Sequence, residues 1–504
     1  MTAEAATANQ ATKSAEPGRG RWLALYVLCA GVLMIVLDVT IVNVALPTIQ
    51  DSLGFSQSDL TWVVNAYLVP FGGLLLLAGR LGDLLGQRKM FLVGLAVFTA
   101  ASLLCAVAEN QAMLIAGRFL AGVGGALASA VVLGMIVTMF PEPREQAKAI
   151  GVYGFVASAG GSIGLLLGGA LTQAISWHWI FVINLPIGLA TAYGATRLVE
   201  DKPGLGFKAG ADIPGAALIT SSLMIGVYAI LGVNTHGWGS AQTLILAAIS
   251  LALGVAFVAR QARIENPLMP LRLFHSRNVV GANVIQSFLV AGMFGMFFLG
   301  ALYLQRILGY DALEVGLAFL PTTIVMGTLS LGFSEKLIMR FGPRTTLIPG
   351  VIMVGIGLLL FARTPVHGDY LTDLLPPLLL VGLGVGTSFP SLMTLAMSGA
   401  TREDSGLASG VVSTSMQVGG AIGLAVLATL AAQRTDSKLA DGAGQLAALN
   451  SGYHLAYVIG AILVGVAVVV AVTVLREVPM PSPEEMAEHA QQPAGEREPA
   501  YSEA

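Results

Sequence analysis

The sequence predicts an all-α integral membrane protein with fourteen transmembrane helices, and three observations support this fold class. Hydrophobic residues make up 55% of the 504 residues and charged residues only 11%, whereas an ordinary soluble domain carries about 25% charged residues. Apolar segments long enough to cross a bilayer fill the chain from Trp22 to Leu475. The segments that join them carry most of the Lys and Arg residues on one side of the predicted membrane. A lipid bilayer is therefore the predicted surrounding of this chain.

The predicted helices follow from length alone. A helix rises about 1.5 Å per residue, so roughly 20 apolar residues are needed to cross the hydrocarbon layer. A first block of six spans covers residues 22–46, 60–79, 90–108, 112–139, 150–172 and 179–196. Two spans follow at 213–233 and 241–259, and a second block of six lies at 279–305, 314–335, 345–362, 374–397, 405–432 and 452–475.

These blocks define the predicted domain organisation. A cytoplasmic tail, 1–21, precedes an N-terminal six-helix bundle, 22–199; a linker with two additional helices, 200–278, then leads to a C-terminal six-helix bundle, 279–475. The last segment, 476–504, is rich in Pro, Glu, Ala and Gln. Such a composition buries too little apolar surface to order itself, so we expect a disordered cytoplasmic tail.

The distribution of Lys and Arg predicts the orientation. Of the 26 Lys and Arg residues, 21 fall on the side that holds both termini, and Arg118 lies inside a span. Cytoplasmic loops carry the excess of positive charge. We therefore expect a multi-pass protein of the cell inner (plasma) membrane with both termini in the cytoplasm.

Two charged residues lie deep within predicted spans. Asp38 is in the first span and Arg118 in the fourth, and a charge at the centre of a spanning helix costs about 2.5 to 3.5 kcal/mol on the insertion scale. Guanidinium stays charged, whereas a buried carboxyl group can gain a proton. The hypothesis is that Arg118 pairs with Asp38 and that protonation releases the contact. The alternatives are a structural brace for Asp38 and a packing clamp for Arg118.

Other polar, aromatic and soft side chains within the spans are candidates for lining a substrate cavity. They could equally serve as hydrogen bonds and packing between helices. The candidates are Met34, Asn43, Asn65, Tyr67, Tyr153, Asn184, Asn283, Gln286, Gln305 and Gln417.

The loop after the second span carries a dense motif, called here the gate motif, which consists of Gly79, Asp83, Gly86, Arg88 and Lys89. Glycines suit a tight turn, and an acid beside two bases can tie helix ends together. A solvated loop that only obeys the positive-inside bias is the alternative. The loop between the tenth and eleventh spans repeats part of this motif, because Gly342 and Arg344 correspond to Gly86 and Arg88.

The fifth span contains three glycines, Gly164, Gly168 and Gly169, which permit close contact between helices. The overlapping Gly-x-Ser-x-Gly pattern at 160–164 lies inside a predicted helix, not at the strand-to-helix turn that a catalytic serine needs. The chain has no Walker sequence and no histidine spacing typical of a metal site. We therefore expect no enzyme, no cofactor, no metal and no nucleic-acid partner.

The gate motif resembles the loop motif of the major facilitator superfamily. Residues 37–47 are similar to the signature of its drug:proton antiporter family with fourteen spans, and residues 118–126 resemble the fourth-span motif, whose arginine that family implicates in proton transfer. Further matches are 177–188, 303–305, 309–310, 406–410 and 417–420. One departure is Leu165, which replaces the proline of the fifth-span antiporter motif and so restores a backbone donor and removes a kink.

The resemblance implies a proton-coupled antiporter that exports hydrophobic drugs, antibiotics or natural products by alternating access, with protons and a small molecule as its partners. A single deep acid favours neutral or monocationic substrates over dications. Function as a monomer is expected. Two alternatives stay open: a proton-coupled uptake symporter and a non-transporting membrane receptor or scaffold.

Overall fold

The computed structural model describes residues 17–57, 59–140, 143–201, 203–204, 206, 212–264, 267–269, 271–398 and 405–477. The predicted disordered tail therefore lies outside the described residues, apart from Arg476 and Glu477, as does most of the N-terminal tail. All the elements within these ranges are helices. The N-terminal bundle consists of α2 (Pro17–Leu53), α3 (Trp62–Leu85), α4 (Gln87–Ala106), α5 (Gln111–Met139), α6 (Pro143–Ala174), α7 (Trp179–Val182) and α8 (Asn184–Leu198).

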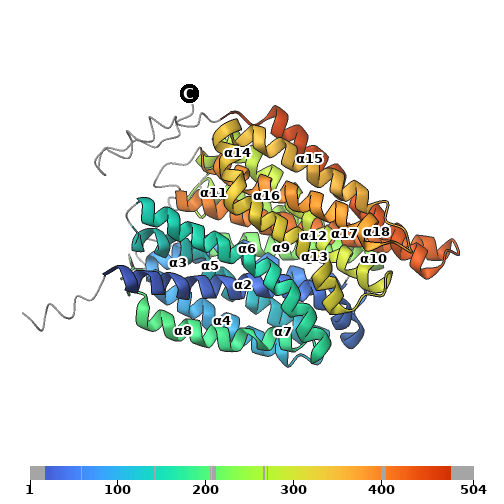
Figure 1. Cartoon of the computed structure of the whole chain (residues 1–504), viewed down its shortest axis with the longest axis horizontal. Helices are drawn as coiled ribbons and strands as arrows, with labels where there is room; N and C mark the ends of the chain where they lie inside the picture. Colours follow the sequence, from blue (N-terminus) through green and yellow to red (C-terminus); the bar gives the residue numbers. More distant parts are fainter. Residues whose placement is uncertain are drawn as a thin grey trace, which may run out of the picture.

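The remaining helices form a central hairpin and a C-terminal bundle. The hairpin consists of α9 (Ile213–Leu231), α10 (Val233–His236) and α11 (Ala241–Gln261). The C-terminal bundle consists of α12 (Arg277–Arg306), α13 (Ala312–Thr328), α14 (Ser334–Phe341), α15 (Pro343–Phe361), α16 (Leu375–Met397), α17 (Ser405–Ala440) and α18 (Gln445–Thr473). In Figure 1 the two bundles lie one above the other, with α2 to α8 below and α12 to α18 above.

Eleven of the described helices are long and apolar enough to cross a membrane, and a twelfth counts if the pair Asp59–Leu75 and Leu77–Leu85, bent by 52°, is one span. Two shorter apolar helices, Ile163–Ala174 and Ala312–Thr328, lie where the fifth and tenth spans are predicted. The tenth is shortened because a π-helical turn, Leu329–Phe333, separates α13 from α14. The count of fourteen spans stays a prediction.

Polar residues at several helix starts explain where these helices begin. Asp311 and Glu314 form a reciprocal capping box at the start of α13, and Asn110 accepts a hydrogen bond from the backbone of Met113 at the start of α5. Such caps satisfy backbone N–H groups that have no partner within the helix. They place the short loops between the spans and fix the register of the helices that follow.

Glycines allow the third and fourth helices of each bundle to cross at close range. A Cβ on Gly94 of α4 would lie 2.4 Å from the backbone nitrogen of Ala128 and 2.8 Å from the carbonyl oxygen of Gly124, both on α5. In the C-terminal bundle, a Cβ on Gly350 of α15 would lie 2.9 Å from the carbonyl oxygen of Gly384 on α16. Side chains at these positions would push the helices apart.

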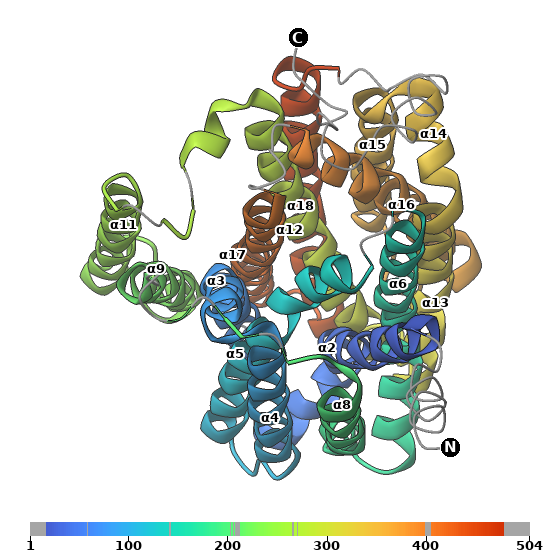
Figure 2. The same ribbon diagram turned by 90° about the vertical axis from the view of Figure 1, so that its left-hand side faces the viewer.

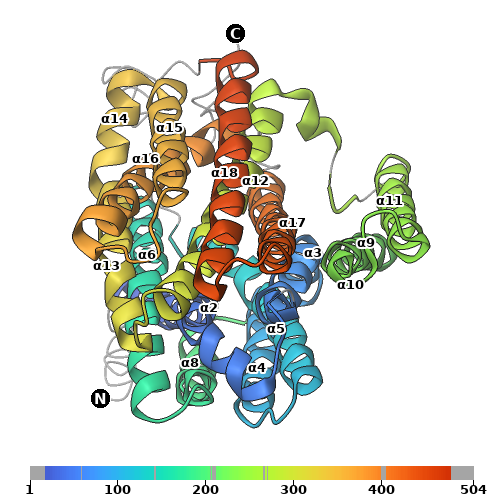
Figure 3. The same ribbon diagram turned by 90° about the vertical axis from the view of Figure 1, so that its right-hand side faces the viewer.

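The two bundles meet along two seams. At the first seam α6 packs on α13, and at the second α3 packs on α17. Helix α9 contacts both α3 and α17, so it covers the second seam, while α11 packs on the other side of α9. Figures 2 and 3 show α9 beside α3 and α17 at the side of the molecule, with α11 farther out.

Candidate functional site

The two deeply placed charges predicted from the sequence lie in contact. Asp38, in the middle of α2, and Arg118, on α5, form an ion pair through Oδ2 and Nη1. Asp38 is 0% exposed and Arg118 is 1% exposed. The pair lies between helices of the N-terminal bundle, so neither side chain faces lipid.

Four further groups hold this pair in place. Arg118 Nε donates a hydrogen bond of 2.9 Å to the carbonyl oxygen of Val63 on α3, and its guanidinium lies 4.6 Å from the centre of the Tyr67 ring. Asn184, at the start of α8, donates a hydrogen bond of 3.1 Å to Asp38 Oδ1 and one of 3.3 Å to the hydroxyl of Ser102. Helices α2, α3, α5 and α8 thus meet at one carboxylate and one guanidinium, and α4 supports Asn184 through Ser102.

This arrangement has a clear energetic consequence. Both carboxylate oxygens of Asp38 accept a hydrogen bond, and the charge of Arg118 is compensated by Asp38. Removing one partner of a buried ion pair leaves an uncompensated charge and typically costs about 3 to 5 kcal/mol. The ion pair therefore holds α2 to α5 at the level of Asp38.

Two residues of α3 carry buried polar atoms without a partner. Both amide atoms of Asn65 and the hydroxyl of Tyr67 are buried and have no hydrogen-bond partner in the described part of the chain. The two residues are two positions apart, so they lie on different faces of α3, and the Tyr67 ring contacts Arg118. A buried polar group without a partner is costly, so both places are suited to a bound water.

The other predicted cavity residues fall into distinct places. Met34 is fully buried, in the N-terminal bundle near Gly188 of α8. Asn43 and Asn283 each donate to a carbonyl oxygen one turn earlier in their own helix, at 3.1 Å and 2.8 Å. Tyr153 is half-buried and Gln286 is buried. None of these five joins the two bundles by a hydrogen bond recorded among the described residues.

Two predicted cavity residues do lie at contacts between the bundles. Gln417 of α17 packs on Gly72 of α3, where a Cβ on the glycine would lie 2.7 Å from the Gln417 Cβ, and its Oε1 is buried without a partner in the described part of the chain. Gln305 Nε2, near the end of α12, donates a hydrogen bond of 3.0 Å to the carbonyl oxygen of Val44 on α2.

Contacts like that of Gln305 close one end of the molecule, called here the outer end because the positive-inside distribution predicts it to be non-cytoplasmic. Arg306, the last residue of α12, forms an ion pair with Asp51 near the end of α2. At the first seam, Gln173 Nε2 on α6 donates a hydrogen bond of 2.7 Å to Asp311 Oδ2. Helix α2 therefore carries both Asp38 at its centre and one side of the outer closure.

The gate motif forms a tight turn between α3 and α4, and its arginine holds the end of a neighbouring helix. Gly86 has a φ of 102°, which favours glycine, and Arg88 Nη2 donates to the carbonyl oxygen of Thr196 near the end of α8. Asp83 and Lys89 are exposed. The side chains of Asp83 and Lys89 therefore lie on the surface of the turn.

The predicted partial repeat in the C-terminal bundle has the same geometry. Gly342 has a φ of 82° between α14 and α15, and Arg344 Nη2 donates a hydrogen bond of 2.7 Å to the carbonyl oxygen of Val472 near the end of α18. In both bundles an arginine two residues after the glycine caps the last helix, where a cation is favourable.

One glycine at the gate is more constrained than the motif suggests. A Cβ on Gly82 would lie 2.3 Å from Val131 Cγ1, whereas a Cβ on Gly79 would meet only Ala130, at 4.0 Å. The close approach of α3 to α5 therefore depends on Gly82, which sequence reasoning did not single out. Spacing alone does not distinguish the two, because both lie near the same turn.

The fifth-span glycines pack α6 on its neighbours. Gly164 and Gly168 lie against α2, where a Cβ would come within 2.0 Å of Thr40 Oγ1 and 2.7 Å of the carbonyl oxygen of Ile41. A Cβ on Gly169 would lie 2.5 Å from the carbonyl oxygen of Ala312 on α13. The motif thus joins α6 both to the helix that carries Asp38 and to the other bundle.

Residues 28–424 match the family described as the Major Facilitator Superfamily. The chain belongs to this superfamily. This agrees with the resemblance drawn from the motifs, and it assigns the Asp38–Arg118 pair and the two seams to a transporter fold.

Curated relatives in the superfamily include exporters and resistance proteins. The chain is 36% identical to the puromycin resistance protein pur8 of Streptomyces alboniger, over 90% of this chain and 91% of the relative. It is 35% identical to the cephamycin export protein CmcT of Amycolatopsis lactamdurans, over 83% of this chain and 86% of the relative. It is also 36% identical to the uncharacterised transporter EfpA of Mycobacterium tuberculosis, over 83% of this chain and 78% of the relative.

Solved structures share the fold. An inward-facing, unoccupied bacterial homologue of the human lysosomal transporter Spinster aligns with a TM-score of 0.64 at 14% identity, over 90% of this chain and 96% of that chain. An auto-inhibited peptide transporter of the POT family aligns with a TM-score of 0.65 at 15% identity, over 91% of this chain and 98% of that chain. At these identities the likeness concerns the fold alone.

Proposed function

We propose that this chain is a proton-coupled antiporter that exports hydrophobic natural products or drugs across the plasma membrane. The observation that carries the proposal is the completely buried Asp38–Arg118 pair, which is a titratable group set in the core of a major facilitator bundle. Buried ionisable residues within membrane spans usually serve transport, because their cost needs a compensating function. Export is supported by relatives named for puromycin resistance and cephamycin export.

The proposed coupling uses α2 as the shared element. With Asp38 ionised, α2 is held to α5 by Arg118 and to α8 by Asn184. A proton on Asp38 cancels its charge, so Arg118 keeps the Val63 carbonyl and the rings of Tyr67 and Phe181 as partners. Helix α2 is then freer to move, and its far end carries the contacts to α12 that close the outer side.

A proton gradient can drive this cycle. Each proton that enters down a potential of 100 mV contributes about 2.3 kcal/mol, and breaking a buried pair involves energies of a similar size. Because Asp38 is shielded in the closed arrangement described above, proton entry requires the bundles to rock or water to reach the unpartnered groups of Asn65 and Tyr67.

The proposed substrate is a hydrophobic molecule that is neutral or carries one positive charge. Polar side chains at the boundary of the bundles, such as Gln305 and Gln417, would orient it, while the surrounding apolar residues supply most of the contact area. A single acid that already compensates Arg118 leaves little negative charge to select a dication. We further infer that the chain acts as a monomer with both termini in the cytoplasm.

Everted membrane vesicles test the proposal and its main alternative. With an acidic interior imposed, the exporter should accumulate puromycin inside the vesicles, whereas an uptake symporter would deplete it. Asp38→Asn should lose the response to the pH gradient yet still exchange puromycin down its own gradient. The control is Glu109→Gln, which removes an exposed acid of the same bundle that belongs neither to the pair nor to the outer closure. Accumulation by Asp38→Asn equal to wild type would overturn the proposal, as would a wild type that moves nothing.

A further inference from the structure

A pocket of about 400 Å³ lies at the outer end of the central hairpin, and neither Asp38 nor Arg118 is among its described lining residues. The loop before α3 and the start of α3 form one wall, the α9–α10 corner and the start of α11 form another, and the last turns of α17 complete it. The pocket therefore involves both bundles and the two additional helices, at the outer end of the second seam. Its size is within the usual range for small-molecule sites.

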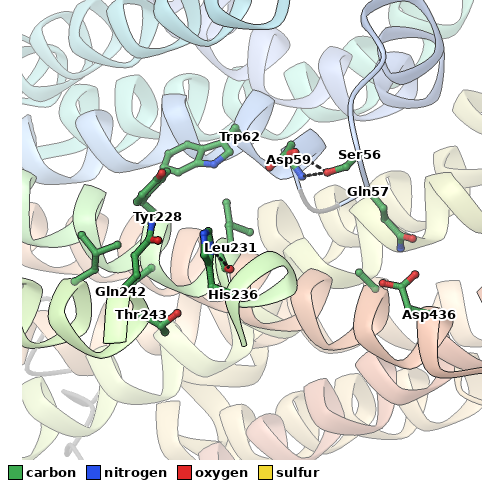
Figure 4. Close-up of a pocket in the computed structure, with 14 residues that line it drawn as sticks. Ser56, Gln57, Asp59, Trp62, Tyr228, Leu231, His236, Gln242, Thr243 and Asp436 are labelled. Atoms are coloured by element: carbon green, nitrogen blue, oxygen red, sulfur yellow. Dashed lines mark hydrogen bonds between the residues drawn. The ribbon is translucent and has the colours of Figure 1, made fainter. Parts of the chain in front are cut away.

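Two aromatic rings form an apolar surface in this pocket. The rings of Trp62 and Tyr228 lie 6.4 Å apart with their planes at 43°, and Tyr228 is 52% exposed. Figure 4 shows both rings on one side of the pocket, with Asp436 on the opposite side. The negative faces of aromatic rings attract organic cations, most strongly in the case of tryptophan.

Two carboxylates line the pocket without a Lys or Arg to balance them. Asp59 and Asp436 line it together with His236, and no Lys or Arg is among its described lining residues. Asp59 is oriented by Ser56, whose hydroxyl donates a hydrogen bond of 2.7 Å to the carboxylate and accepts one of 3.0 Å from the Asp59 backbone. Gln57 also lines the pocket, and its buried Nε2 has no partner among the described residues. That donor suits an oxygen atom on the same ligand.

The pocket is held open by contacts of the hairpin with α17. Thr429 of α17 donates a hydrogen bond of 3.4 Å to the carbonyl oxygen of Ile230 on α9, and Trp238 Nε1 donates one of 3.3 Å to Gln433 Oε1 on α17. These bonds keep the α9–α10 corner beside α17 and leave the space in front of Trp62 unfilled.

We propose that this pocket binds an organic cation with an apolar body, independently of the Asp38–Arg118 pair. Trp62 and Tyr228 contact the apolar groups and face the positive charge, while Asp59 and Asp436 neutralise it. Two sources supply this chemistry: a diffusible drug-like cation and the ammonium headgroup of a membrane lipid. The assignment also gives the central hairpin a role, because three of its segments line the site.

Tryptophan fluorescence of the purified full-length protein tests the proposal. Tetraphenylphosphonium should quench the emission saturably, and this component should vanish in Trp62→Phe. Tetraphenylborate, which has nearly the same shape and the opposite charge, should not produce it. The double variant Asp59→Asn with Asp436→Asn should bind tetraphenylphosphonium about tenfold more weakly, since two partly exposed carboxylates lose their charge. Asp38→Asn serves as the control and should bind as wild type does.

Lipid composition distinguishes the two sources. In nanodiscs of phosphatidylglycerol alone no lipid cation competes, so weaker binding when phosphatidylcholine is added would assign the site to a lipid headgroup. Unchanged binding would assign it to a diffusible cation. The proposal is overturned if the two tetraphenyl ions bind alike, if Trp62→Phe keeps the saturable component, or if the double variant binds as wild type does. None of these results bears on proton-driven transport, so the two proposals fail separately.

Discussion

The N-terminal and C-terminal bundles share their packing but differ in the charge they bury. Gly94 and Gly124 make the crossing of α4 and α5, as Gly350 and Gly384 make the crossing of α15 and α16. When these glycines are aligned, Arg118 lies six residues before Gly124, and Leu378 lies six residues before Gly384. Leu378 is buried.

The difference indicates a division of labour between bundles that are otherwise alike. The shared glycines and the shared turn serve the fold, because both copies retain them. The ion pair is not needed for that fold, because a leucine occupies the corresponding place in the second copy. We therefore infer that the N-terminal bundle handles the proton, while the C-terminal bundle mainly supplies a rigid partner and part of the substrate boundary.

Making the N-terminal bundle resemble the C-terminal one tests this inference most severely. Arg118→Leu leaves the carboxylate of Asp38 buried without its cation and should destabilise the protein by about 3 to 5 kcal/mol, less if the acid gains a proton. The measurement is thermal unfolding in detergent. Leu378→Ala, a cavity-forming change at the corresponding place, provides a comparison without any charge effect.

The matched rescue is the double variant Arg118→Leu with Asp38→Asn. It removes both charges, so it should recover much of the lost stability while it still fails to respond to a pH gradient. If the double variant is no more stable than Arg118→Leu, the loss comes from packing and not from an uncompensated charge.

The glycine crossings should respond unequally to alanine. The Cβ of Gly94→Ala meets backbone, with Ala128 N at 2.4 Å, whereas that of Gly350→Ala first meets the hydroxyl oxygens of Ser388 and Thr387, both at 2.5 Å, which can turn away. Overpacking in a core costs about 1 to 3 kcal/mol, and Gly94→Ala should lie at the upper end. Equal melting temperatures for the two variants would show that the crossings are equally tolerant.

The two arginine caps should respond equally. Arg88→Leu and Arg344→Leu each remove a cation from the end of a last helix, α8 or α18, at an expected cost of about 1 kcal/mol. The effect should appear as a lower free energy of unfolding and as faster amide hydrogen exchange at those helix ends. A loss confined to Arg88→Leu would mean that the gate motif, not the cap it shares with the second copy, holds the helix.

The smallest effect is expected outside both bundles, at the base of the central hairpin. Burial acts to raise the pKa of Asp212, but hydrogen bonds from Arg260, Gly215 and Gln261 outweigh it and hold that pKa below its ordinary value of 3.8. A carboxyl group whose pKa is lower in the folded than in the unfolded protein stabilises the hairpin at pH values above its unfolded pKa. That stabilisation is lost as the pH falls through the folded pKa.

In Asp212→Asn, the part of the stability that wild type loses on acidification through this carboxyl group should be absent. Transport at neutral pH should be unchanged. The measurement is the free energy of unfolding of wild type and of Asp212→Asn, from neutral to acidic pH. A variant whose stability falls with acid as steeply as that of wild type would remove Asp212 from the account.

The sequence was sufficient for the superfamily, the all-helical fold and the meeting of Asp38 with Arg118, because two opposite charges within apolar spans have few other ways to be compensated. It did not predict Ser102 or the backbone of Val63 as neighbours, since one hydroxyl and one carbonyl among many carry no pattern. Asn184 was visible only as one polar residue among several. The close approach at Gly82 depends on helix crossing, which spacing does not encode.

The number of spans shows a different limit. Hydropathy treats 314–335 as one span, yet a π-helical turn divides it, and an insertion of this kind has no apolar signature. The outer pocket was equally hidden, because it brings together Asp59, Tyr228 and Asp436 from three separate regions of the chain.

Proton release on substrate binding tests the central claim most directly. In an antiporter whose substrate and proton exclude one another, adding puromycin to the purified protein in weakly buffered detergent should release protons. A pH indicator reports the release across the range in which the protein stays folded. Wild type and Glu109→Gln should release protons, and Asp38→Asn should release none although it still binds puromycin. Equal release from Asp38→Asn and wild type would contradict the account.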